Sequence, residues 1–219
     1  MEGVGYKTKS KMVYDVLKRR IETQYYKQGA SIVISTVSKE MDTSAIPVRE
    51  AMKMLETEGY LKIIPHKGAL VTRFSEESIA DIIEIRAVLE GLAAKKAMKW
   101  IKEADVVRLE NLVKDMDTCI NSQNVKEFRR LNREFHAIIY KASKCERLCD
   151  MISQLWEMSD WANKKMQESP EIMSKSNQEH KEIIHMFKDK NEENIEQYVR
   201  THKLKLKGKG RTERQSKKD

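Results

Sequence analysis

Three cysteines and five histidines are the side chains of this 219-residue chain whose types best suit a transition metal. Cys145 and Cys149 lie one helical turn apart, but no second pair of thiols could complete a tetrahedral site with them. Together with Cys119 they do not make a disulfide framework. We interpret all three as small apolar-facing residues of a protein that is kept reduced.

Asn132 and His136 have a spacing that could place two ligands on one side of a helix. They are four residues apart, so on a helix they project from the same face. A single buried histidine is more often a polar core residue than a metal ligand. A metal site at His136 would therefore need further ligands from other elements of the chain.

The N-terminal third predicts two helices that meet across a tight turn. A first amphipathic helix follows from Lys11 and is expected to end at Gln28-Gly29. A short helix is expected from Ser35, as its N-cap, to Met41, and residues 42–44 read as a turn. The next helix has Pro47 in its first turn, where the missing N–H is harmless, and ends at Gly59. This order predicts a helix-turn-helix.

Two short strands are expected directly after the helix that ends at Gly59. Residues 60–64 and 69–72 are apolar runs separated by the turn residues 65–68, so they predict a hairpin that would form a wing. An unrelated small αβ domain is the alternative, and the order of the elements disfavours it.

The remainder of the chain is expected to be almost entirely helical. Helices are predicted near 76–100, 103–121, 124–142, 145–167, 171–189 and 191–206. Six helices with short connections predict an antiparallel bundle. The fold class is thus mainly α, with a winged helix-turn-helix at 8–74, a helical domain at 75–206 and a basic tail at 207–219 that we expect to be disordered.

Charge is distributed unevenly along the chain. The net charge of +8 divides into +5 for residues 1–74 (13 Lys+Arg, 8 Asp+Glu), −3 for 75–202 (21 and 24) and +6 for 203–219 (8 and 2). Clustered basic residues are typical of a phosphate-binding surface, although a solvated lysine-rich surface has the same composition. No apolar run of membrane-spanning length and no secretory signal occur, so a cytoplasmic protein is expected.

These segments resemble the GntR family of bacterial regulators. The resemblance rests on residues 44–51 (SAIPVREA), 55–61 (LETEGYL) and 65–71 (PHKGALV). The second half resembles that family's all-helical FCD effector domain in residues 84–90 (EIRAVLE), 132–136 (NREFH), Glu179-His180 and His202. The likeness covers about residues 10–206.

The resemblance implies that the second helix of the motif enters the major groove and that the wing touches the minor groove. Arginine usually stands in this family where Ser35 and Ala45 stand here, and neither of these can read guanine as arginine does. The usual operator of the family is therefore not expected. The DNA-binding residues that the resemblance implies are Ser35, Thr43, Ser44, Ala45, Pro47, Arg49, Lys53, His66, Lys67 and Gly68.

The resemblance also implies a divalent metal held by Asn132, His136, His180 and His202. Neutral imidazoles suit Zn²⁺, Ni²⁺, Fe²⁺ or Mn²⁺. Asn132 replaces the aspartate that is common in the family, and the loss of one negative charge should weaken the site. Arg86 is expected to bind the carboxylate of an effector, or else to pair internally with Glu84, Glu90 or another acid; the residues favour neither alternative.

The function that follows is a dimeric, ligand-responsive transcription regulator rather than an enzyme. A repressor is expected, with an operator in duplex DNA and a small carboxylate as effector. One alternative is a metal-dependent hydrolase that uses the three histidines. No HExxH motif occurs, however, and neither Glu134 nor Glu179 has the spacing of a general base. The other alternative is a nucleic-acid-binding protein without sequence preference, driven by the basic tail.

Overall fold

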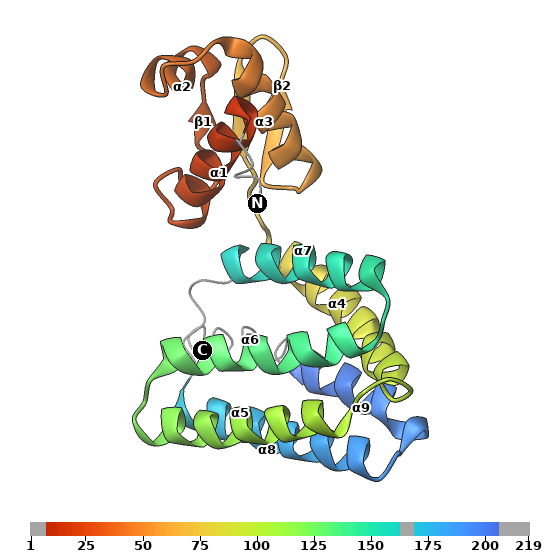
Figure 1. The fold of residues 1–219 in the computed structure, drawn as a ribbon. Coiled ribbons are helices and arrows are strands. Elements are labelled where there is room, and N and C mark those ends of the chain that lie inside the picture. Colours follow the sequence, from red (N-terminus) through yellow and green to blue (C-terminus); the bar gives the residue numbers. More distant parts are fainter. Residues whose placement is uncertain (1–7, 163–168, 206–219) are drawn as a thin grey trace, which may run out of the picture. The chain divides into compact units, whose positions relative to one another are not determined.

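The computed structural model describes residues 8–162 and 169–205. The chain divides into two compact units, Met1–Glu77 and Ser78–Asp219, which are described separately. Figure 1 shows strands only in the first unit, and the described part of the second is helical. The predicted mainly α fold is confirmed, with a winged helix-turn-helix followed by six helices.

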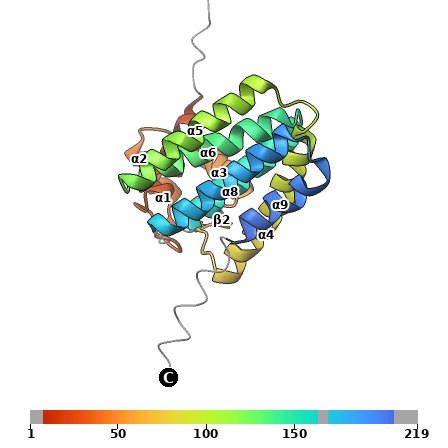
Figure 2. The same ribbon diagram turned by 90° about the horizontal axis from the view of Figure 1, so that it is seen from below.

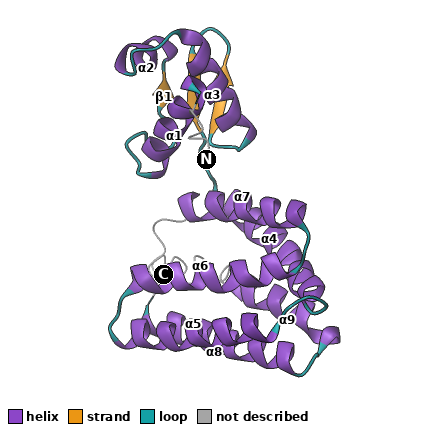
Figure 3. Cartoon of the chain, in the orientation of Figure 1, coloured by secondary structure: helices purple, strands orange, loops and turns teal. Residues whose placement is uncertain are grey.

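The first unit contains three helices and a small antiparallel sheet (Figure 3). Its helices are α1 (Lys9–Glu22), α2 (Ile34–Glu40) and α3 (Ala45–Thr57), and its strands are β1 (Ser31–Ile32), β2 (Leu61–Ile64) and β3 (Gly68–Val71). The strand order is β1-β3-β2, and Ile63 pairs with Ala69 in the β2–β3 hairpin. This hairpin is the wing.

The helix α3 is fixed by its apolar face and by one bond to the wing. Leu17 and Ile21 of α1 and Val48 and Leu55 of α3 are fully buried where the two helices pack together. The carboxylate of Glu56 accepts a hydrogen bond of 2.7 Å from the backbone N–H of Ile63 in β2. Because these contacts use one side of α3, the opposite side is left open to solvent.

Two local predictions in the first unit differ from the structure. The helix α1 ends at Glu22 rather than near Gln28, because Thr23 caps it and Gln24 adopts a left-handed backbone with a φ of 62°. The N-cap of α2 is Val33, so the prediction that Ser35 is the N-cap was wrong.

The strand β1 was not predicted, because two residues carry no periodic signal. It lies very close to the wing: a Cβ added at Gly68, whose φ is +106°, would lie 2.3 Å from the carbonyl oxygen of Ile32. Glycine is therefore required at the first residue of β3.

The second unit contains six described helices. They are α4 (Glu76–Ala97), α5 (Glu103–Asn121), α6 (Val125–Ala142), α7 (Glu146–Ala162), α8 (Pro170–Lys188) and α9 (Glu192–Leu204). The helix α4 ends three residues earlier than predicted, in a turn at 98–100. The predicted continuation of α7 to residue 167 lies outside the described residues, as does the predicted disordered tail.

The helices α5, α6 and α8 form the centre of this unit. Figure 2 shows them side by side, and α5 contacts both of the others. Side chains cap the N-termini of α6 and α8: Asn124 accepts from the N–H of Glu127, and Ser169 accepts from the N–H of Ile172. These two caps fix where the helices begin that carry His136 and His180.

The helices α4 and α9 approach each other closely at Gly91. A Cβ at this position would lie 2.7 Å from the carbonyl oxygen of Glu196, so only glycine allows the two backbones this separation. The neighbouring Glu90 on α4 can therefore reach Lys203 on α9, at 3.2 Å between Oε2 and Nζ. Among the described helices, none is long and apolar enough to cross a membrane.

Candidate metal centre and nucleic-acid interface

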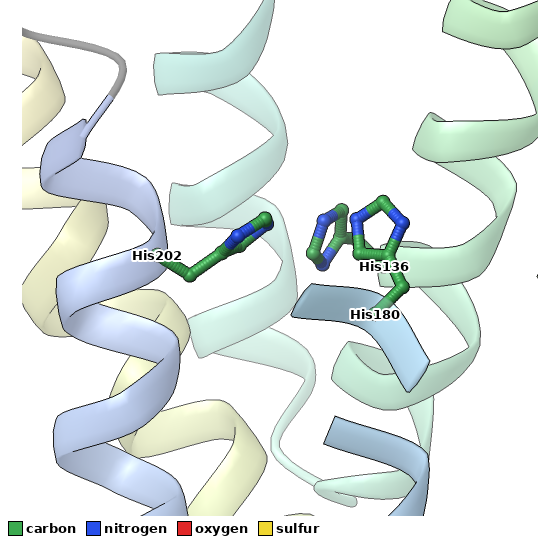
Figure 4. A group of neighbouring side chains, drawn as sticks. All are labelled: His136, His180 and His202. Atoms are coloured by element: carbon green, nitrogen blue, oxygen red, sulfur yellow. The ribbon is translucent and has the colours of Figure 1, made fainter. Parts of the chain in front are cut away.

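His136, His180 and His202 meet inside the helical unit. They come from α6, α8 and α9, and their rings point toward one common space (Figure 4). The ring centroids lie 5.1 Å (136–180), 5.5 Å (136–202) and 5.1 Å (180–202) apart, and one nitrogen from each lies within 4.8 Å of the others. All three side chains are buried, with exposed fractions of 1%, 0% and 4%.

Burial keeps these imidazoles neutral. It lowers the pKa of His136 and of His180 well below 6.5, and nearby positive charge lowers both further. Both ring nitrogens of His136 and the Nε2 of His180 have no hydrogen-bond partner among the described residues. A neutral imidazole has one nitrogen with a free lone pair, which is the donor that a divalent transition metal needs, so these residues fit such an ion.

Two of the rings are oriented by hydrogen bonds on the side away from the common space. Glu179 lies 2.5 Å from Nδ1 of His202, and the carbonyl of Asn177 lies 3.4 Å from Nδ1 of His180. Because these contacts use Nδ1, the Nε2 of each ring is left for a ligand, and hydrogen bonds of this kind commonly orient histidines that bind metals. Burial alone would raise the pKa of Glu179, but its bonds with His202 and Lys205 lower it to about 2.

Asn132 lies one turn before His136 on α6 and is half-buried. Its carbonyl could complete the set of donors, and its role as a fourth ligand stays a prediction. The remaining histidines lie elsewhere: His185 is exposed on α8, and His66 is exposed in the wing.

A second buried cluster lies beside the histidines, around Trp156, whose ring centroid is 5.7 Å from that of His136. The guanidinium of Arg86 and the ammonium of Lys203 lie over this ring, at 4.3 and 4.6 Å from its centroid. Arg86 donates to Oε1 of Glu90 from Nε (3.0 Å) and Nη2 (2.8 Å), and to the hydroxyl of Ser159 (2.5 Å).

Two cations in this cluster share one carboxylate. Burial would raise the pKa of Glu90, but Lys203 and Arg86 outweigh it, so the pKa is lowered and Glu90 is ionised. Burial lowers the pKa of Lys203 to about 8, although Glu90 opposes the shift. Asp160, which also faces Lys203, is exposed and pairs with Arg133. The cluster therefore keeps one excess positive charge at neutral pH.

Sequence reasoning found Arg86 and named Glu90 as a possible partner, and this internal pair is present. It missed Lys203, which is 3% exposed, and Ser159. The position of Lys203 directly after His202 was the available signal, because it places the lysine on the helix that carries a candidate ligand.

The exposed side of α3 carries several of the residues predicted to bind DNA. Ala45, Arg49 and Lys53 are exposed on this side, and Pro47 lies in the first turn. Ser44 is the N-cap of α3, is exposed and makes no capping bond, so its hydroxyl is available to a phosphate. Ser35 is exposed on α2.

Two of the predicted DNA-binding residues have a different environment. The hydroxyl of Thr43 is buried and has no hydrogen-bond partner among the described residues, so a phosphate contact would require a change of rotamer. Gly68 is buried at the start of β3 and is fixed by its close contact with β1. The exposed tip of the wing is formed by residues 65–67, which include His66 and Lys67.

Two family models match the chain. The model of the bacterial regulatory proteins of the gntR family matches residues 9–71, and the FCD domain model matches residues 81–204. A curated relative is the HTH-type transcriptional regulator YdhC of Bacillus subtilis, 27% identical over 190 residues (86% of this chain and 85% of YdhC). McbR of Escherichia coli is 27% identical over 140 residues, which is 64% of this chain and 63% of McbR.

Solved structures share the fold. E. coli McbR/YncC superposes with a TM-score of 0.70 at 21% identity and covers 91% of this chain and 95% of its own. A GntR regulator from Rhodococcus superposes with a TM-score of 0.67 at 17% identity, over 92% of this chain and 96% of its own.

The metal-free helical unit should lose stability as the pH falls below about 6.5. His136 and His180 have a lower pKa when folded than when unfolded, so the unfolded state binds more protons in acid. Their stabilising effect is complete above 6.5 and is lost below it, at up to about 1.4 kcal/mol per pH unit for each histidine. Glu179 acts only at lower pH, below its unfolded pKa of about 4.5.

Denaturant unfolding between pH 5 and pH 8, after chelation, measures this slope. All three tryptophans lie in the helical unit, so their fluorescence reports on it alone. His136→Gln should decrease the slope, whereas His185→Gln, a change at an exposed site, should not. An identical slope in all three proteins would contradict the assignment.

Proposed function

The chain belongs to the GntR family of bacterial regulatory proteins and carries its FCD domain, and on this premise we propose that it is a ligand-responsive repressor of transcription. It is a DNA-binding transcription regulator of this type. The observation that carries the proposal is the open side of α3, which presents Arg49 and Lys53 where a recognition helix meets the major groove.

Its form on DNA is proposed to be a homodimer. A two-fold dimer places two recognition helices about one DNA turn apart, ~34 Å, and so requires an inverted repeat. Residues 8–74 would bind the DNA, residues 75–206 would bind the effector and the partner subunit, and the basic tail would add contacts that do not depend on sequence. Such a regulator acts in the cytoplasm, where bacterial DNA lies.

A divalent metal ion is proposed to be held by His136, His180 and His202, with Asn132 as the fourth protein ligand. The support is the set of unpartnered buried nitrogens that face one another. Such an ion supplies a Lewis acid that can bind an anion. The chain's own contribution is to hold three neutral imidazoles from three helices at one point, so that the ion would link α6, α8 and α9.

The proposed effector is a small carboxylate. Arg86 is already paired with Glu90, so Arg86 alone gives no reason for an anion. The excess charge comes from Lys203, which shares the same carboxylate and is buried. A buried positive charge without a full counter-charge is unfavourable, and an anionic ligand would balance it.

The two alternatives are less well supported. A hydrolase needs a free general base near the metal, but Glu179 is bound to His202 and Lys205, and Glu134 pairs with Arg130 at the surface. Binding driven only by a basic tail does not account for the ordered wing and the open side of α3.

Footprinting on the DNA around the protein's own gene tests the main proposal. The protein should protect a short inverted repeat, because a dimer presents two equal recognition helices. Arg49→Ala should reduce protection strongly, while Arg108→Ala, in the helical unit, should not. Uniform protection without sequence preference would support the non-specific alternative and contradict the proposal.

Metal analysis tests the three-histidine site. The protein should take up one divalent ion per chain. His136→Ala or His180→Ala should lower the affinity by a hundredfold or more, as is typical for loss of a ligand or its support. His185→Ala, on the same helix as His180 but exposed, is the control and should bind normally. Asn132→Asp should bind more tightly, because it adds a negative charge. Unchanged uptake in the His136 and His180 variants would remove the site.

Titration of the metal-loaded protein with citrate, succinate and acetate tests the effector class. Lys203→Met removes the excess charge and leaves the Arg86–Glu90 pair intact, so anion binding should weaken at least about tenfold while metal uptake is retained. Lys203→Arg should restore binding. Equal affinities in wild type and Lys203→Met would exclude this lysine from the effector site.

A further inference from the structure

Ile46 is the large apolar side chain that α3 exposes most. It has an exposed fraction of 67%, and it directly follows Ala45, which is also exposed. The apolar residues that join α3 to the core are Val48, Ala51, Met52 and Leu55, and Ile46 is not among them. Leaving most of an isoleucine in water forfeits much of the free energy that its burial would contribute.

The position of Ile46 determines what could cover it. It lies in the first turn of α3, the second helix of the helix-turn-helix, and N-terminal residues of this helix contact base edges in the major groove. Arg49 and Lys53 are exposed further along the same helix, and their charge suits the phosphates that flank the groove. An apolar residue surrounded in this way suits duplex DNA better than an apolar protein surface.

The largest apolar group on the major-groove edge of the bases is the methyl group of thymine. Guanine, adenine and cytosine present hydrogen-bond donors and acceptors there, whereas thymine adds a C5-methyl group. Isoleucine against a polar edge would remove water from donors and acceptors without replacing their hydrogen bonds. Isoleucine against thymine buries two apolar surfaces together.

We propose that Ile46, with the methyl group of Ala45 beside it, selects a thymine in each half-site by contact with the thymine C5-methyl. This inference rests on the proposed function, since it requires a sequence-specific complex with duplex DNA. It assigns to the first turn of α3 a readout by apolar contact, and so replaces the guanine readout for which Ala45 has no donor.

The experiment uses the full-length protein and two sets of DNA probes. Binding sequences are first selected from a pool of random duplexes. Each thymine of the selected half-site is then replaced by uracil, in both half-sites at once, which removes one methyl group and keeps every hydrogen-bonding group. Dissociation constants are measured for wild type, Ile46→Ala and Met12→Ala. Met12 is 53% exposed on α1, so it is a matched apolar change away from α3.

One thymine should be sensitive to its methyl group in the wild type. Its replacement should weaken binding about fourfold per half-site, the effect of one buried methyl group. The Met12→Ala protein should show the same sensitivity, whereas Ile46→Ala should bind the thymine and uracil probes within about twofold of each other.

Two results would overturn the inference and leave the regulator intact: a selected sequence with no methyl-sensitive thymine, or equal sensitivity in wild type and Ile46→Ala. A random pool from which no sequence is enriched would instead overturn the proposed function, and the thymine contact with it.

Discussion

An imidazole nitrogen that is buried without a hydrogen bond destabilises a fold, and the helical unit places three such nitrogens at one point, two of His136 and one of His180. Each costs about 1–3 kcal/mol. The surrounding structure holds them there through the capped starts of α6 and α8, the glycine contact between α4 and α9, and the bonds of Glu179 and Asn177 to the outer sides of the rings. A bound ion would satisfy one nitrogen of each ring.

The charged cluster and the three histidines lie next to each other and share Trp156 as a neighbour. Trp156 lies next to His136 and next to both cations, and Lys203 is the residue after His202 on α9. A ligand at one cluster would therefore lie against residues that also contact the other. This contiguity gives the proposed regulator a physical route by which a metal and an anion influence each other within the helical unit.

The sequence predicted the fold well because most elements carry a periodic signal. The helices of the second unit were placed within about three residues wherever they are described, and the hairpin within one residue. The strand β1 and the end of α1 were not predicted, since β1 exists only through its pairing with β3 and α1 ends where Gln24 turns left-handed. Neither feature has a local pattern.

The site was predicted less completely than the fold. Family likeness indicated the three histidines, and the structure brings them together. Family likeness could not indicate that the side chain of Lys203 is buried or that the hydroxyl of Thr43 is buried. Side-chain direction depends on how neighbouring helices cross, which one helix's sequence does not specify. The exposure of Ile46 likewise became informative only when the buried side of α3 was known.

A ligand-responsive repressor of the proposed kind requires the buried histidine site and the DNA-binding unit to be thermodynamically linked. The most direct measurement is the affinity of the chelated protein for Zn²⁺ in the presence and absence of a saturating selected operator duplex, compared with its operator affinity with and without Zn²⁺. Linkage requires the two ratios to be equal, and we expect a common factor of about 5 to 150, the usual size of such coupling. Identical Zn²⁺ affinities with and without operator would contradict it.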